Sequence, residues 1–168
     1  TRYIGDWSSD VCSSDLVPID TQHPCDHCVE HDPEQLVQSV STAIEHVVKD
    51  IDISNIISAG LATQRSSIVC WDKVTGKTLS PVISWQDTRT TDQIELLAEY
   101  AELVHAETGM RLSTHYGASK MKWCLANLSE VQSAFEYKQL AMWPLASFLV
   151  YKLTREDGFF VEIGRAYV

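Results

Sequence analysis

Three short apolar segments between residues 55 and 85 constrain the fold more than any other feature of this sequence. Residues 55–63 are almost continuously apolar, which is typical of a strand covered on both faces. Residues 67–71 and 82–85 are two further predicted strands. The turn between them contains Gly76, where a positive φ costs little. These patterns predict an antiparallel hairpin beside a buried strand.

Helices are expected on both sides of these strands. Apolar repeats at spacings of three and four, together with capping residues, predict helices over residues 33–50, 91–108, 118–127, 129–138 and 144–153. Asp32 is the predicted N-cap of the first helix, Ser129 is that of the fourth, and Pro144 suits the start of the fifth. Three strands are too few for a closed barrel, so the sequence predicts an open α/β sheet flanked by helices.

Length and charge limit the class of protein. The chain has 168 residues, of which 45% are hydrophobic, and this suits one globular domain. A net charge of -10 argues against nucleic acid and anionic membranes as partners, because both would repel it. The longest apolar runs, such as residues 56–62 and 145–150, are too short to span a bilayer. We expect a cytoplasmic protein that binds a small neutral molecule.

The cysteines suggest reduced thiols. Five cysteines are scattered along the chain, so their number predicts no disulfide framework. Cys25, His27, Cys28 and His31 form a local cluster that could hold zinc in tetrahedral geometry. No second Cys or His pair with ligand spacing follows, and we therefore favour a polar surface loop without metal.

The two ends of the chain read differently from the middle. Residues 1–16 contain the near repeat Ser-Ser-Asp-Val and Ser-Ser-Asp-Leu and show neither strand nor helix periodicity. They resemble translated adapter sequence, so we expect residues 1–16 to be non-native. Residues 155–168 form a tail of doubtful origin.

One stretch of sequence resembles a known family. Residues 60–73 read Gly-Leu-Ala-Thr-Gln-Arg-Ser-Ser-Ile-Val-Cys-Trp-Asp-Lys, residues 75–77 read Thr-Gly-Lys, and residues 85–90 read Trp-Gln-Asp-Thr-Arg-Thr. Glycerol kinase-like members of the FGGY family of carbohydrate kinases carry Gly-Ile-Thr-Asn-Gln-Arg-Glu, Trp-Asp-Lys-x-Thr-Gly-Lys and Trp-Gln-Asp-x-Arg-Thr in the same order and spacing. The resemblance covers residues 17–154, and we interpret these as part of an FGGY kinase N-terminal domain.

The resemblance implies an incomplete ribonuclease H-like, or actin-like ATPase, domain with a mixed sheet flanked by helices. It also implies an enzyme that transfers the γ-phosphate of ATP, with Mg2+, to a hydroxyl of a sugar or polyol. The family's phosphate-binding hairpin Asp-Gln-Gly-Thr-Thr has no match in this chain, and its general-base Asp is expected beyond residue 168. We therefore expect no catalytic residue in this chain, and no activity from it alone.

The resemblance also assigns a substrate pocket. Arg65 follows the predicted buried strand, where its planar guanidinium suits two neighbouring hydroxyls. Gln64 is expected to support Arg65, and Trp85 to offer its ring to the C–H side of the substrate. Ser66 and His115 stand where glycerol kinases carry Glu and Tyr, and this difference predicts a substrate other than glycerol. Asp87 and Arg89 are expected to pair with each other or to cap the following helix instead of binding substrate.

Other functions stay open at this point. A sugar-binding or inactive kinase-like module would keep the pocket without phosphate transfer. A zinc protein would use the cysteine and histidine cluster, and a purely structural domain would bind nothing. The sequence leaves open whether the protein forms a homo-oligomer.

Overall fold

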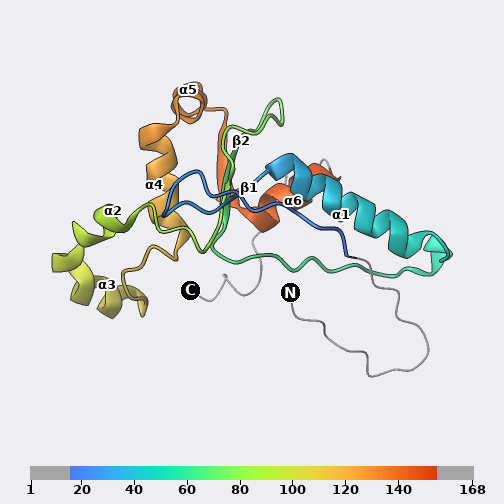
Figure 1. Cartoon of the computed structure of the whole chain (residues 1–168), viewed down its shortest axis with the longest axis horizontal. Helices are drawn as coiled ribbons and strands as arrows, with labels where there is room; N and C mark the ends of the chain where they lie inside the picture. Colours follow the sequence, from blue (N-terminus) through green and yellow to red (C-terminus); the bar gives the residue numbers. More distant parts are fainter. Residues whose placement is uncertain (1–15, 155–168) are drawn as a thin grey trace.

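The computed structural model describes residues 16–154, in which a four-stranded sheet lies between two layers of helices (Figure 1). The strands lie in the order β1 (Glu30–His31), β3 (Val82–Ile83), β2 (Ile68–Asp72) and β4 (Leu140–Pro144). The α/β architecture is as expected. We expected a mixed sheet, whereas the three pairings in residues 16–154 are all antiparallel.

Alternation along β2 divides the core into two halves. Val69 and Trp71 pack with residues of α1 (Pro33–Val48) and α6 (Leu145–Thr154) on one face. Ile68 and Cys70 pack on the other face with α4 (Gly117–Asn127) and α5 (Ser129–Glu136). All four of these β2 side chains are fully buried. The central strand therefore joins both helical layers.

Local signals predicted two elements well. Asp32 caps α1, and its carboxylate accepts hydrogen bonds from the N–H groups of Glu34 and Gln35. The hairpin of β2 and β3 is confirmed, since Asp72 accepts from two N–H groups of the following turn and Gly76 adopts a φ of 73°.

The prediction of a buried strand over residues 55–63 is wrong. A short 3-10 helix, η1 (Ile53–Asn55), is followed by irregular, exposed chain, in which Ile57 is 99% exposed. No strand within residues 16–154 pairs with this segment. A strand needs a neighbour for its N–H and C=O groups, so apolar character alone does not create one.

The helix predicted over residues 91–108 is broken into three parts. These are α2 (Thr91–Glu95), η2 (Ala98–Tyr100) and α3 (Ala101–Thr108), and none of them has a fully buried side chain. Helices gain most of their stability from packing, which this segment lacks. The predicted end is confirmed, because Gly109 adopts a φ of 70°.

Strand β4 was not predicted, and two helix starts were misplaced. Pro144 ends β4, which pairs with all five residues of β2, and α6 begins one residue later. Leu128, not Ser129, is the N-cap of α5, with no side-chain capping bond. Strand β4 has only five residues, and periodicity alone is ambiguous at that length. Its pairing with β2 is what identifies it as a strand.

The expectation of reduced thiols is wrong for one pair. Cys25 and Cys28 form a disulfide, whereas Cys70 and Cys124 are free and buried. No helix within residues 16–154 is long and apolar enough to cross a membrane. The predicted non-native segment and tail lie outside the described residues, apart from Leu16.

Candidate functional site

Four of the expected site residues lie at one edge of the sheet. Because β2 and β3 are antiparallel, the start of β2 and the end of β3 meet there, and Arg65 and Ser66 lie near Trp85. Ser67 joins the two segments: its hydroxyl accepts from the Trp85 N–H at 3.0 Å and donates to the Gln64 side chain at 2.8 Å. Ser67 was not predicted as a site residue, and only its position beside Arg65 and Ser66 could have suggested it.

His115 reaches the same edge from the start of α4. Gly117 allows this approach, because a Cβ at that position would lie 2.8 Å from the Ile68 side chain. The His115 ring lies edge-on to the Trp85 ring, with centroids 5.6 Å apart. The structure therefore brings together two residues that lie 30 positions apart in the sequence. Both are open to solvent: Trp85 is 41% exposed, and His115 is exposed as well.

Arg65 and Ser66 form a turn before β2, in which Arg65 is exposed and Ser66 is half-buried. Within the described part of the chain, no hydrogen bond or ion pair engages the Arg65 guanidinium. Ser66 adopts a φ of 65°, a conformation that is uncommon for a residue other than glycine and that tends to occur at functional sites. The N–H donors of the Arg65 guanidinium are therefore free to bind a ligand.

Gln64 anchors the turn to the sheet. Its side-chain oxygen accepts from Ser67, and its amide nitrogen lies 3.4 Å from the His31 Nε2 of β1. We expected Gln64 to support Arg65. The contacts shown are with the side chains of Ser67 and His31, and the support of Arg65 stays a prediction.

Lys120, on α4, is a site residue that sequence reasoning missed. Its side chain is fully buried, and its ammonium donates to the carbonyl oxygens of His115 at 3.1 Å and of Trp85 at 3.5 Å. Burial lowers the pKa of Lys120 to about 8, while the charge of Asp87 opposes this shift and that of Arg89 adds to it. The sequence gives no signal of this burial, because lysines are mostly exposed.

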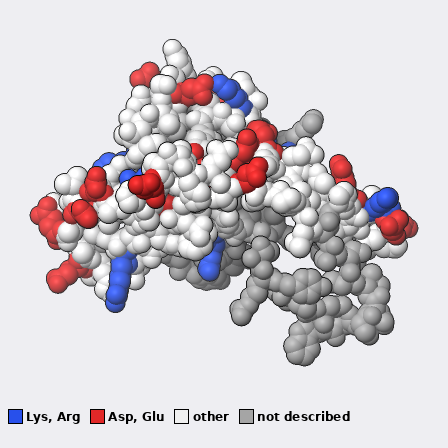
Figure 2. Space-filling view, viewed as in Figure 1, with Lys and Arg blue, Asp and Glu red and all other residues white. Residues whose placement is uncertain are grey.

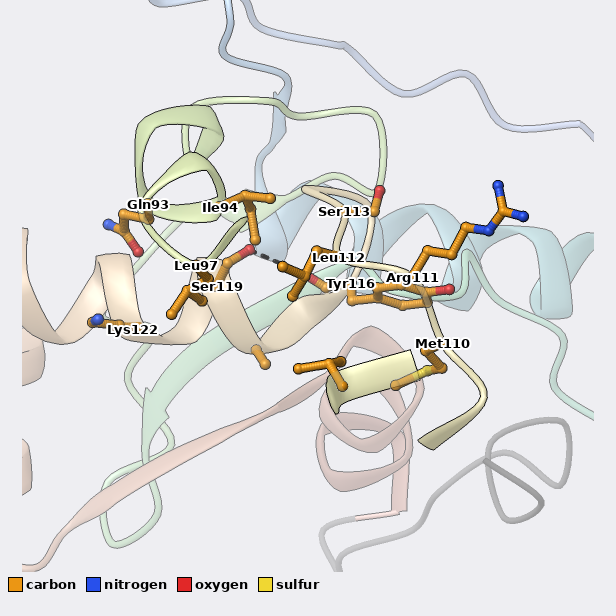
Figure 3. Close-up of a pocket in the computed structure, with 12 residues that line it drawn as sticks. Gln93, Ile94, Leu97, Met110, Arg111, Leu112, Ser113, Tyr116, Ser119 and Lys122 are labelled. Atoms are coloured by element: carbon orange, nitrogen blue, oxygen red, sulfur yellow. Dashed lines mark hydrogen bonds between the residues drawn. The ribbon is translucent and has the colours of Figure 1, made fainter. Parts of the chain in front are cut away.

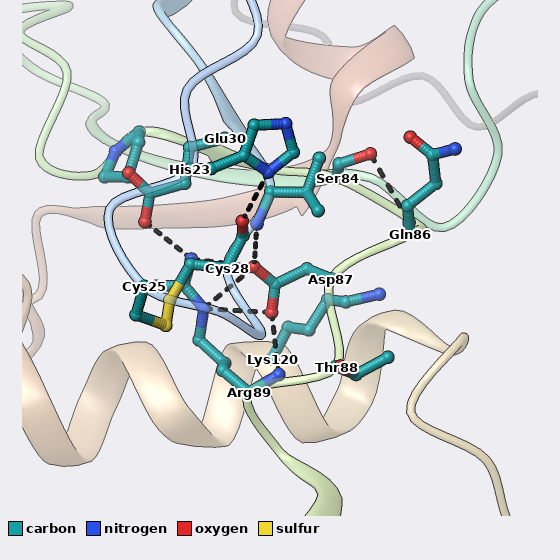
Figure 4. A network of polar contacts seen from close by, with 12 residues as sticks. His23, Cys25, Cys28, Glu30, Ser84, Gln86, Asp87, Thr88, Arg89 and Lys120 are labelled. Carbon is teal, nitrogen blue, oxygen red and sulfur yellow. Dashed lines mark hydrogen bonds and ion pairs between the residues drawn. A yellow bond between two sulfur atoms is a disulfide. The ribbon is translucent and has the colours of Figure 1, made fainter.

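A buried ion-pair network holds the segment that follows Trp85 (Figure 4). Asp87 and Arg89 pair as expected, at 2.7 Å, and the Arg89 guanidinium also reaches Glu30 at 2.6 Å. The Asp87 carboxylate also accepts from the Val29 N–H at 2.7 Å and from the Arg89 backbone N–H at 3.0 Å. Desolvation disfavours the charge of Arg89, but the hydrogen bonds that Arg89 donates to both carboxylates outweigh it and raise the pKa of Arg89. The network fixes the Trp85 segment against β1.

The cysteine and histidine cluster does not form a metal site. Within residues 16–154, no group of three or more His, Cys, Asp or Glu side chains is arranged to hold a metal ion. The Cys25–Cys28 disulfide leaves no thiolate in the cluster, and His31 Nδ1 contacts the Asp20 carbonyl instead. In the described residues these side chains are therefore arranged as a disulfide-bonded loop, and the absence of metal stays a prediction.

An apolar cavity of about 280 Å³ lies between α2, α3 and α4 (Figure 3). Its walls are mainly hydrophobic side chains, among them Ile94, Leu97, Val104, Met110 and Leu112. Arg111 also borders the cavity, but its guanidinium points away from it in Figure 3. Sugar hydroxyls need polar partners, so the polar edge at Trp85 and His115 is the better candidate for a carbohydrate.

The fold and this polar edge define an α/β domain with a candidate site for a hydroxylated ligand. The sequence model of the N-terminal domain of the FGGY family of carbohydrate kinases matches residues 4–166. The chain belongs to this family.

Glycerol kinases are among its relatives. That of Aquifex aeolicus (strain VF5) is 32% identical over 126 residues, which are 75% of this chain and 26% of the relative. That of Parabacteroides distasonis is 32% identical over 153 residues, or 89% of this chain and 31% of the relative. The chain thus spans between about a quarter and a third of these relatives.

Solved structures confirm the fold. The crystal structure of Plasmodium falciparum glycerol kinase with ADP matches with a TM-score of 0.75 at 24% identity, over 83% of this chain and 29% of that one. Xylulose kinase from Rhodospirillum rubrum matches with a TM-score of 0.67 at 18% identity, over 88% and 32%. The ribonuclease H-like, actin-like class is therefore confirmed.

Proposed function

We propose that this chain is the sugar-binding part of a kinase that transfers the γ-phosphate of ATP to a hydroxyl of a sugar or a polyol other than glycerol. The observation that carries the proposal is the contact of the Trp85 and His115 rings at one edge of the sheet, next to the turn that holds Arg65 and that Ser67 joins to the Trp85 backbone. A guanidinium beside an aromatic ring offers donors for hydroxyls and an apolar face for C–H groups, which is what a sugar requires.

Family membership supplies the nucleotide side of the proposal. ATP provides the phosphoryl group and Mg2+ neutralises phosphate charge when they are bound. The Plasmodium falciparum structure was determined with ADP. Residues 16–154 show no cluster of His, Cys, Asp and Glu that fits a metal ion. The proposal therefore assigns sugar binding to the described residues, and it assigns the steps at the phosphate to the rest of the complete enzyme.

Two side chains argue for a substrate other than glycerol. Ser66 and His115 stand where the glycerol kinase pattern has Glu and Tyr. A charged acceptor in a site built for a small polyol contributes strongly to discrimination, and the Ser66 hydroxyl does not replace it. A larger polyol or a sugar can make further contacts beyond this edge.

A sugar-binding module without phosphate transfer is the second candidate. The same convergence favours it, because the residues at this edge bind a hydroxylated ligand without taking part in chemistry. The complete protein distinguishes the two: turnover of ATP that depends on a sugar supports the kinase, and sugar binding without turnover supports the module.

Arg65→Ala in the complete enzyme tests the proposed site. Loss of a charged hydrogen bond costs about 1.5–3 kcal/mol, so kcat/KM on the best substrate should fall roughly tenfold to more than a hundredfold. Because Arg65 is exposed and without an ion pair in the described residues, the thermal midpoint should stay close to that of the wild type. Arg65→Lys should also be impaired, since an ammonium lacks the planar fork.

Arg111→Ala is the matched control, because Arg111 is exposed on another loop and its guanidinium points into solvent. It should leave kcat/KM unchanged. Wild-type kcat/KM in Arg65→Ala would show that the site has been misassigned.

A further inference from the structure

The side chain of Lys120 is buried, and its ammonium donates hydrogen bonds to two carbonyl groups of the candidate sugar site. One is that of Trp85, after β3, and the other is that of His115, before α4. We propose that Lys120 is a positioning residue that holds the Trp85 and His115 segments at the spacing that sugar binding requires. This inference rests on the proposed function, since it concerns the same site.

The geometry shows why one side chain controls both segments. Trp85 follows β3 and His115 precedes α4, and the two rings contact each other edge-on. The Lys120 ammonium forms a polar link between the two backbones. A lysine has three donors on one atom and can therefore bind two carbonyls at once. Without it, the ring contact and the more distant contact of the Thr90 and Ser119 hydroxyls, at 3.0 Å, would still join these parts of the chain, but no bond would join the two carbonyls.

Charge balance explains why an ammonium occupies this position. Glu30 and Asp87 are two largely buried carboxylates, and Arg89 supplies one positive charge between them. Lys120 supplies the second, and Asp87 acts on it favourably while Arg89 acts against it. The four groups are together neutral, whereas the cluster without Lys120 would bury an excess negative charge.

The protonation state of Lys120 should therefore affect the site. An ammonium binds carbonyl oxygens more strongly than an amine does. The pKa of Lys120 is about 8, so the proton leaves as the pH rises through this value. The link between the segments then weakens, and the KM for the sugar should rise above about pH 8. The charges that act on this ammonium are those of Asp87 and Arg89, whereas His115 meets it through its backbone carbonyl.

The effect on stability has the opposite sign. The pKa of Lys120 is lower in the folded chain than its ordinary value of 10.5, so the unfolded state binds more protons between about pH 8 and 10.5. The contribution of Lys120 to folding stability therefore increases with pH across this window. If Lys120 served folding alone, sugar binding would not weaken between about pH 8 and 10.5, the range in which its contribution to stability increases.

The test measures sugar KM, ATP KM and kcat of the complete enzyme between about pH 6.5 and 9.5, a range that brackets the pKa. Lys120→Met should raise the sugar KM by about tenfold or more at neutral pH, with the ATP KM within about twofold of the wild type. Lys122→Met, at an exposed position two residues further along α4, should change neither. An unchanged sugar KM in folded Lys120→Met overturns the proposal, as does an equal rise in both KM values.

Lys120→Arg decides the matter if Lys120→Met does not fold. A guanidinium stays charged throughout this range, so the rise of the sugar KM above about pH 8 should disappear. A rise that persists in Lys120→Arg would exclude Lys120 as its source. Arg65→Ala separates the two proposals: if it weakens sugar use and the Lys120 variants do not, only the positioning role fails, and if it has no effect, the site itself is misassigned.

Discussion

At the scale of single residues, positions 66 and 115 are where the candidate site departs from the glycerol kinase pattern. Ser66 adopts a positive φ on the turn before β2, and the ring of His115 contacts that of Trp85. Glutamate at position 66 would add a charged acceptor, and tyrosine at position 115 would place a phenol beside the Trp85 ring. These two exchanges change hydrogen-bonding capacity at the edge of the sheet while leaving the buried core unaltered.

The first expectation is that the complete enzyme uses another polyol or a sugar better than glycerol. Ser66→Glu combined with His115→Tyr should raise kcat/KM for glycerol relative to the wild-type substrate by about tenfold or more, because a charged acceptor then binds the glycerol hydroxyls. A panel of polyols and sugars ranked by kcat/KM measures both effects. Glycerol in first place for the wild type would end this interpretation of positions 66 and 115.

At the scale of elements, the Cys25–Cys28 disulfide stabilises the loop that leads into β1. Backbone hydrogen bonds between Gln22 and Glu30 close the two sides of this loop. The Thr88 N–H donates to the His27 carbonyl, which ties the loop to the segment after Trp85. The loop that leads into β1 and the candidate site therefore both contact the segment that follows Trp85.

Cys25→Ser combined with Cys28→Ser should lower the free energy of unfolding by about 2 kcal/mol at room temperature, because a cross-link over so short a loop removes little unfolded-state entropy. Urea denaturation under oxidising conditions measures this difference. In the presence of a dithiol reductant, the wild type and the variant should have similar midpoints. A difference that persists after reduction would show that serine disturbs the loop for reasons other than the lost bond.

The elements also show which features could be read from the sequence. Asp32 before Pro33 and the turn at Gly76 are local signals, and the elements they begin or join formed as predicted. Residues 55–63 and β4 depend on a paired neighbour, which periodicity does not contain. The edge residues of the site came from the family motif, whereas Lys120 is recognisable only after α4 has packed on the start of β2.

At the scale of the whole molecule, the chain corresponds to one part of the longer glycerol kinases that it matches. Acidic side chains are spread over the face shown in Figure 2, where basic ones are fewer, in keeping with the net charge of -10. Such a surface suits a neutral ligand such as a sugar. The matched segments make up 26% and 31% of the two glycerol kinases compared above. Most of the length of those enzymes therefore has no counterpart in this chain.

The last expectation is that the 168-residue polypeptide does not transfer phosphate from ATP to any sugar or polyol. Phosphoryl transfer depends on holding the nucleotide, the metal and the acceptor hydroxyl in line, and this positioning accounts for many orders of magnitude in rate. The described residues supply an edge for the sugar and no metal-binding cluster. Purified chain should therefore release no more ADP than a buffer control across a panel of sugars and polyols, whereas the complete enzyme should show turnover that depends on its sugar. Sugar-dependent ADP release by the 168-residue polypeptide, well above the buffer control, would show that the machinery for phosphate transfer is already present within it.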